Sequence, residues 1–131
     1  PIYKIMHFHT GMDFTAQTGT EIYATGDGTI EKASNEGNGY GIHVIINHGY
    51  GYQTLYGHMS RVKVAPGQKV KRGEVIGYVG NTGTSSGPHV HYEVIKNGEK
   101  INPVNFFYSD LSPAEYEKVI ELSSRANQSF D

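Results

Sequence analysis

Between Glu21 and about Lys96, short segments rich in Ile, Val, Tyr and Thr alternate with turns that contain glycine. Segments of this composition and length are expected to form strands. The expected strands are Ile22–Thr25, Thr29–Ala33, Gly41–Asn47, Gln53–His58, Lys69–Val70, Glu74–Val79 and His89–Ile95. Because no helical periodicity separates them, the pattern predicts a mainly β fold, an antiparallel sandwich or barrel.

The chain changes character after Pro103. Ser112, Pro113 and Glu115 form a helix-capping pattern, with Pro at the first helical position. The following residues carry a partly apolar stripe at helical spacing, so we expect a C-terminal helix from about Pro113 to Ala126, packed outside the sheet. The expected organisation is one β domain over residues 1–108 and a helical extension over residues 109–131.

Composition excludes several classes of function. With 11 basic and 13 acidic residues in 131, the chain lacks the positive charge of a nucleic-acid-binding protein. It has no Cys, which excludes disulfides and cysteine-ligated metal sites. No run approaches the roughly 18 apolar residues of a membrane span. Since the chain opens at Pro1 without Met, we interpret it as part of a longer, exported protein.

Seven histidines are many for a chain of this size, and two of them form the sequence His89-Val90-His91. In a strand, His89, His91 and Glu93 would lie on one face, with successive side chains about 7 Å apart. That spacing suits one histidine that binds a metal and another that acts on the metal's water. Alone, such a pair is as readily explained as two polar residues on a solvated face.

Two further groups could join this pair. His9 and Asp13 could bind one ion if the chain turned at Gly11, although such pairs often lie in loops without a ligand. In a strand, Thr54, Tyr56 and His58 would project to one side; His58 could equally be a surface residue at a strand end. Two histidines and one aspartate are three protein ligands, the number that leaves a catalytic zinc one open position.

The other histidines receive structural interpretations. We expect His43 to face solvent or the rim of a groove, and His48 to satisfy backbone groups at a strand-to-turn junction. His7 is expected at the surface. The loop from Gly80 to Gly87 lacks the Lys and the helix of a phosphate-binding loop, and is better suited to form one wall of a substrate groove.

Taken together, these motifs resemble those of the lysostaphin-type (LytM-type) zinc endopeptidases, which hydrolyse peptidoglycan. The resemblance runs from about His9 to Pro103 and is carried by these segments: His9-Thr10-Gly11-Met12-Asp13-Phe14, Gly19-Thr20, Ile22-Tyr23-Ala24, Gly26-Asp27-Gly28, Tyr56-Gly57-His58, Gly80-Asn81-Thr82-Gly83 and Ser86-Gly87-Pro88-His89-Val90-His91-Tyr92-Glu93.

The resemblance implies specific roles. His9, Asp13 and His91 match the zinc ligands, His89 matches an acid–base residue, and His58 matches the remaining active-site histidine. It implies hydrolysis of peptidoglycan stem or cross-bridge peptides through a zinc-bound water, by a monomer in the periplasm or outside the cell. Since the chain starts just before His9, we expect the family's upstream strand to be absent or shortened.

Two other functions are compatible with parts of the sequence. A non-catalytic LytM-like module that activates another wall hydrolase should have lost metal ligands, and none is lost here. The stretch from Val62 to Gly80 resembles half of a lipoyl-type carrier domain, but no Met-Lys-Met or Asp-Lys element is present. Within peptidoglycan we favour D-Ala–diaminopimelate bonds over Gly-Gly bonds, because Pro1–Lys4 and the C-terminal extension are closer to Gram-negative members.

Overall fold

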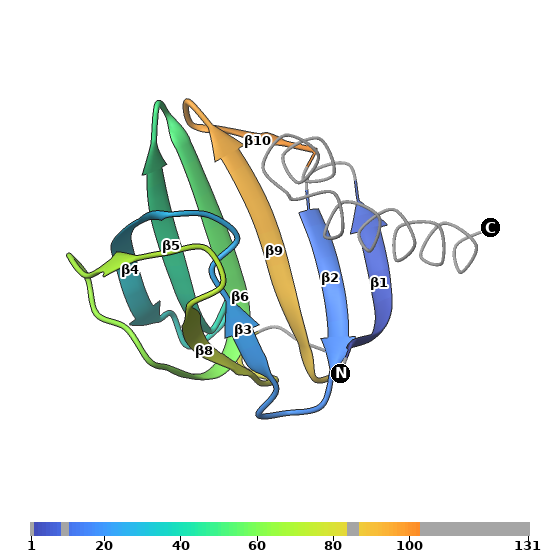
Figure 1. Cartoon of the computed structure of the whole chain (residues 1–131). Helices are drawn as coiled ribbons and strands as arrows, with labels where there is room; N and C mark the ends of the chain where they lie inside the picture. Colours follow the sequence, from blue (N-terminus) through green and yellow to red (C-terminus); the bar gives the residue numbers. More distant parts are fainter. Residues whose placement is uncertain (1, 9–10, 84–86, 103–131) are drawn as a thin grey trace.

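The fold is that of a computed structural model, which describes residues 2–8, 11–83 and 87–102. This part contains ten strands, all paired antiparallel (Figure 1). They are β1 (Ile2–Phe8), β2 (Gly11–Ala16), β3 (Glu21–Tyr23), β4 (Gly28–Asn35), β5 (Ile42–Gly49), β6 (Tyr52–Val62), β7 (Lys69–Val70), β8 (Val75–Val79), β9 (His89–Lys96) and β10 (Glu99–Ile101).

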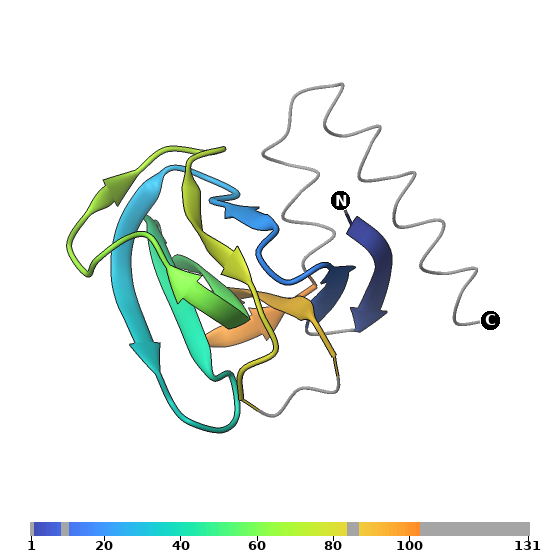
Figure 2. The ribbon, with the colours of Figure 1, turned by 90° about the horizontal axis from the view of Figure 1, so that it is seen from below.

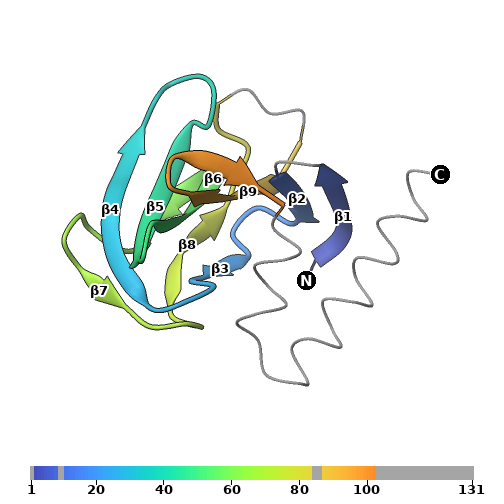
Figure 3. The same cartoon turned by 90° about the horizontal axis from the view of Figure 1, so that it is seen from above.

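The long strands form one continuous sheet in the order β1-β2-β9-β6-β5-β4-β7. Strand β8 pairs with the end of β6 and with β3, so the chain folds back over one face of the sheet. Seen from below and above, the sheet is strongly curved, with β3 and β8 on its inner side (Figures 2 and 3). The mainly β, antiparallel fold predicted from the sequence is confirmed.

The apolar core lies between the β3–β8 pair and the central strands. Ile22 and Ile76 come from the pair, whereas Val44, Tyr56 and Val94 come from β5, β6 and β9, and all five are buried. Strand β9 is covered on both edges, by β2 and by β6. Because β9 is paired along both edges, its register with β2 and with β6 is fixed, and so is the face on which each of its side chains lies.

Each strand expected from the sequence is present, with small shifts at its ends. Strands β1, β2 and β10 were not expected. Strand β10 follows β9 through a tight hairpin at Asn97-Gly98, where both residues have positive φ (51° and 83°) as this turn type requires. The upstream strand was expected to be absent or shortened; a strand is present there, since β1 precedes β2 and pairs with it along most of its length.

The expected C-terminal helix, Pro113 to Ala126, lies outside the described residues, and so does the proposed extension over residues 109–131. Within the described residues, no helix has the length and apolar character needed to cross a membrane.

Candidate active site

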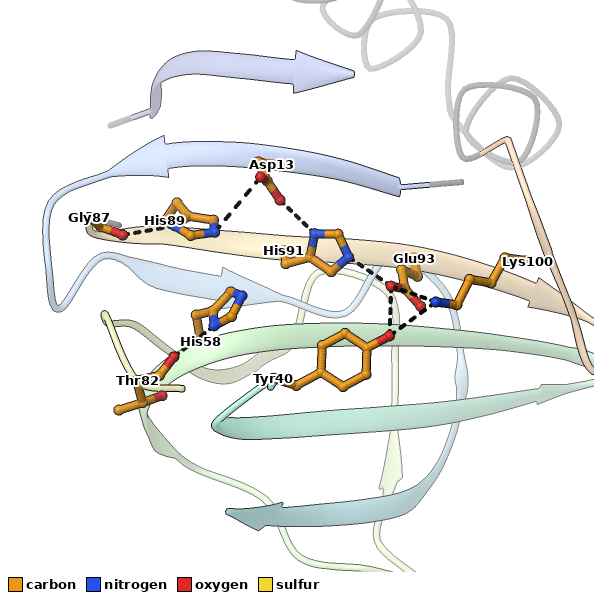
Figure 4. A network of polar contacts seen from close by, with 9 residues as sticks. All are labelled: Asp13, Tyr40, His58, Thr82, Gly87, His89, His91, Glu93 and Lys100. Carbon is orange, nitrogen blue, oxygen red and sulfur yellow. Dashed lines mark hydrogen bonds and ion pairs between the residues drawn. The ribbon is translucent and has the colours of Figure 1, made fainter. Parts of the chain in front are cut away.

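Strand β9 places three polar side chains on the face away from the core. Val90, Tyr92 and Val94 are buried in the core, so the alternating residues His89, His91 and Glu93 lie on the opposite face, as the sequence predicted. Asp13 on β2 is the register partner of His91. The Asp13 Oδ1 atom lies 2.6 Å from His91 Nδ1, and Asp13 Oδ2 lies 3.8 Å from His89 Nε2 (Figure 4).

His58 reaches the same face from β6 because the strand is irregular there. Its φ is +59°, and the β5–β6 register shifts between the pairs Val44↔Tyr56 and Ile42↔Met59. Tyr56 and Met59 both point into the core, whereas the His58 ring lies 4.7 Å from the His89 ring between centroids. The expectation that Tyr56 and His58 share one side was therefore wrong. A bulge redirects His58 towards the site.

The two histidines outside the Asp13–His91 pair have defined tautomers. His58 donates its Nδ1–H to the Thr82 carbonyl at 2.7 Å, and His89 donates its Nδ1–H to the Gly87 carbonyl at 2.8 Å. A carbonyl oxygen only accepts, so both Nδ1 atoms carry hydrogen. In each neutral ring, Nε2 therefore keeps its lone pair and can accept a proton.

The pKa values of His58 and His91 are shifted in opposite directions. Burial lowers the pKa of His58, and the neighbouring His89 and His91 add to this, against an opposing hydrogen bond to Thr82. Burial also acts to lower the pKa of His91, but hydrogen bonds and charges from Asp13 and Glu93 outweigh it and raise the pKa to about 9. The site thus combines a neutral histidine with a histidine held between two carboxylates.

The chemistry of the Asp13–His91 pair fits a metal ion. An imidazole nitrogen and a carboxylate oxygen face each other, and both are good zinc ligands. A second carboxylate, Glu93, adds negative charge behind His91. Among the described residues no three His, Asp or Glu side chains surround a common metal position, and the third expected ligand, His9, lies outside those residues.

Gly11 has a different role from the one expected. It begins strand β2 instead of supplying a turn, and a Cβ at this position would lie 2.9 Å from Cε1 of His91. Carbon atoms in contact normally lie about 3.5–4.0 Å apart. The His91 ring occupies the space that a side chain at position 11 would need, which explains the glycine there.

Two residues of the site were missed in the sequence. The Tyr40 hydroxyl donates to Glu93 Oε2 at 2.8 Å, and the Thr82 carbonyl holds His58. The available signal was Gly39-Tyr40-Gly41, a large aromatic between two glycines, both of which have positive φ (64° and 63°). Such a segment can bring its backbone close to a neighbouring loop.

Outside the site, the structural roles expected for His43, His48 and His7 have different outcomes. The expectation for His43 was wrong: its side chain is 1% exposed and its Nδ1–H donates to the Gly41 carbonyl at 2.9 Å. His48 does satisfy a turn backbone group, since its Nδ1 lies 2.7 Å from the Asp27 carbonyl. The side chain of His7 lies outside the described part of the chain.

An antiparallel β fold with an Asp–His pair beside two further histidines is the arrangement of a metallopeptidase. The model of Peptidase family M23 matches residues 7–103, and the chain belongs to this family. This confirms the lysostaphin-type resemblance.

Relatives and solved structures agree with this assignment. The chain is 48% identical over 105 residues to the DD-carboxypeptidase/endopeptidase Mpg of Neisseria meningitidis, covering 80% of this chain and 24% of Mpg. It is 44% identical over 102 residues to the peptidoglycan DD-endopeptidase ShyA of Vibrio cholerae, covering 78% of this chain and 24% of ShyA. The chain thus spans about a quarter of the length of these relatives.

Two crystal structures share the fold. A zinc-containing peptidase from Vibrio cholerae is 36% identical with a TM-score of 0.69, over 72% of this chain and 29% of that one. The catalytic domain of lysostaphin from Staphylococcus simulans is 29% identical with a TM-score of 0.70, over 82% of this chain and 89% of that one.

Proposed function

We propose that this chain is the catalytic domain of a zinc metalloendopeptidase that hydrolyses peptide cross-links of peptidoglycan. The observation that carries the proposal is the Asp13–His91 pair at 2.6 Å, flanked by two histidines, His58 and His89, whose Nδ1–H groups donate to backbone carbonyls. Relatives named as peptidoglycan endopeptidases support the substrate class, and the zinc-containing Vibrio cholerae structure supports the metal.

In this proposal His9, Asp13 and His91 hold the zinc, which would leave one position open for chemistry. When bound, zinc would supply Lewis-acid chemistry, polarising the scissile carbonyl and making water a stronger nucleophile. Asp13 would supply an oxygen ligand, and His91 would supply its Nδ1 atom, which faces Asp13.

His89 is assigned as the general base. Its Nε2 lone pair lies on the Asp13 side of the site, where it would take a proton from the attacking water. His58 has the same tautomer, so the neutral ring offers a lone pair and not a donor. It would stabilise an oxyanion or protonate the leaving amine only after it has received a proton, for which His89 is the nearest partner among the described rings.

For the bond cleaved, we propose the D-Ala–diaminopimelate cross-link over Gly-Gly bridges, since both relatives compared above are named DD-endopeptidases or carry that activity in their name. The same names support action in the cell envelope, in the periplasm or outside the cell. Digestion of defined muropeptides, with identification of the new termini by mass spectrometry, distinguishes the two bond types.

Substitution of single residues tests the roles. Asp13→Ala and His91→Ala should lose bound zinc and hydrolysis together, because each removes a ligand. His89→Ala and His58→Ala should keep stoichiometric zinc and lose about 10²–10⁴-fold in kcat, the usual contribution of a general acid or base. Metal content by mass spectrometry and release of peptides from purified sacculi measure both properties. Hydrolysis at the wild-type rate by His89→Ala would show that the base is another group.

A further inference from the structure

We propose that Tyr40 and Glu93 act together as positioning residues that hold the His91 imidazole, with its Nδ1 atom presented to the metal. This inference rests on the proposed function and deepens it. Both residues contact the His91 ring directly, Glu93 through a hydrogen bond to Nε2 and Tyr40 through its ring face.

The Glu93 carboxylate is buried, with its side chain 5% exposed. Three donors converge on its Oε2 atom: His91 Nε2 at 2.7 Å, the Tyr40 hydroxyl at 2.8 Å and Lys100 Nζ at 3.4 Å (Figure 4). Its Oε1 atom is buried and has no hydrogen-bond partner among the described residues. A buried carboxylate is costly unless it is paired, so its place beside His91 calls for a specific explanation.

The hydrogen bond from His91 decides which nitrogen is available. A carboxylate accepts, so His91 donates its Nε2–H to Glu93. Nδ1 lies 2.6 Å from the Asp13 carboxylate, so by the same reasoning it carries a hydrogen while no metal is bound. A metal ligand must be deprotonated, so a metal bound beside Asp13 would replace the hydrogen on Nδ1, while the hydrogen bond to Glu93 keeps the one on Nε2. Histidine ligands in metal sites commonly donate their second N–H to a carboxylate in this way, and such partners strengthen metal binding.

Tyr40 holds the same ring in a second way. Its ring stacks on the His91 ring, with centroids 5.9 Å apart and an interplanar angle of 19°. Its hydroxyl donates to Glu93, and its carbonyl accepts the His58 backbone N–H at 2.7 Å. One residue therefore contacts the expected ligand His91, the partner Glu93 and the backbone of the His58 bulge.

The segment that carries Tyr40 is itself fixed in place. A Cβ at Gly41 would lie 2.5 Å from the carbonyl carbon of Thr82 and from the backbone N of Gly83. At these distances the Tyr40 segment packs directly against the loop that contains Thr82. The carbonyl of Thr82 in turn accepts the hydrogen bond from His58. Lys100 is half exposed and is therefore expected to contribute less than the buried members.

The test compares Glu93→Gln and Tyr40→Phe with Tyr56→Phe as the matched control. Glu93→Gln keeps the shape and removes the charge, and Tyr40→Phe keeps the ring stack and removes the hydroxyl. Tyr56→Phe also removes a buried tyrosine hydroxyl, one that hydrogen-bonds to Thr25 and Thr54 away from the site. The readouts are zinc Kd by chelator competition, the visible spectrum of the cobalt(II)-loaded protein, and thermal unfolding of the metal-free protein.

Glu93→Gln should raise the zinc Kd by about 10–100-fold and Tyr40→Phe by about 10-fold, the effect expected of outer-shell partners. Both should change the cobalt(II) bands, which report the geometry of the ligands. Tyr56→Phe should lower the unfolding temperature and leave the zinc Kd and the bands at wild-type values, which separates positioning from stability.

The outcomes that contradict the inference differ from those that contradict the proposed function. If the wild type binds zinc and cleaves peptidoglycan while Glu93→Gln and Tyr40→Phe keep the wild-type Kd and spectrum, the positioning role is wrong and the function stands. If Tyr56→Phe weakens zinc binding as much as they do, the effect is general destabilisation and the positioning role is again wrong. A wild-type chain that binds no zinc overturns both proposals.

Discussion

A single methyl group added at Gly11 should displace His91. A Cβ there would lie 2.9 Å from His91 Cε1 and 3.3 Å from both His91 Nε2 and the Tyr92 carbonyl oxygen. Gly11 does not have positive φ, so alanine fits its backbone conformation and the steric contact is the main cost. The first distance is about 0.6 Å below the optimal separation of two carbon atoms.

The His91 ring has little freedom to move away. Its two nitrogens are hydrogen-bonded to Asp13 at 2.6 Å and to Glu93 at 2.7 Å, and its face stacks on Tyr40. Overpacking of this kind costs about 1–3 kcal/mol. Replacement of Gly by Ala also adds about 0.4–1 kcal/mol to the free energy of unfolding, because it reduces the conformational entropy of the unfolded chain. We therefore expect Gly11→Ala to lower the free energy of unfolding by about 1–2 kcal/mol and to weaken zinc binding about 10–100-fold.

Gly57→Ala is the matched control, because Gly57 is the register partner of His91 on the other side, in β6. A Cβ there would lie 3.4 Å from Tyr40 Cδ1 and 3.6 Å from His91 Cβ, which is ordinary van der Waals contact. Urea unfolding of the metal-free proteins and zinc Kd by chelator competition measure both effects. Wild-type zinc affinity in Gly11→Ala, or equal damage from Gly57→Ala, would refute the argument from ring displacement.

Three further results are expected. Burial raises the pKa of Tyr56 above its ordinary value of 10.0, because the folded protein favours the neutral hydroxyl. The contribution of this hydroxyl to the free energy of unfolding is complete below pH 10 and is lost as the pH rises through the raised pKa. Urea unfolding from pH 8 to 11 should then show a narrowing gap between wild type and Tyr56→Phe, whereas a constant gap would contradict this. Thr82→Val removes a hydroxyl that donates to the Met59 carbonyl at 2.6 Å and accepts from the Ile42 N–H at 3.1 Å. Urea unfolding should show a free energy of unfolding lower by about 1–3 kcal/mol. A loss below roughly 0.5 kcal/mol, the least expected for one hydrogen bond, would contradict this role of the hydroxyl. Removal of metal with dipicolinate should abolish release of peptides from sacculi, and added zinc should restore it; activity that survives chelation would contradict a zinc enzyme.

Much of the fold follows from local sequence patterns. The strand segments from Glu21 to Lys96 were predicted because β-branched and aromatic residues between glycine turns favour extended backbone locally. Strand alternation correctly placed His89, His91 and Glu93 on one face. Strand β2 was missed because Gly11 and Asp13 have low strand propensity; pairing with β1 and β9 on both sides overrides it.

The sequence by itself determined the β architecture, the family and the histidines and carboxylates that are candidates for chemistry. Only the tertiary structure decided how they meet: the β2–β9 register sets Asp13 opposite His91, the bulge redirects His58, and His43 is buried instead of exposed. Alternation along a strand is a property of consecutive residues. Register, bulges and burial instead depend on hydrogen bonds and packing between segments far apart in the chain, so Tyr40 could join Glu93 and His91 only once the sheet had formed.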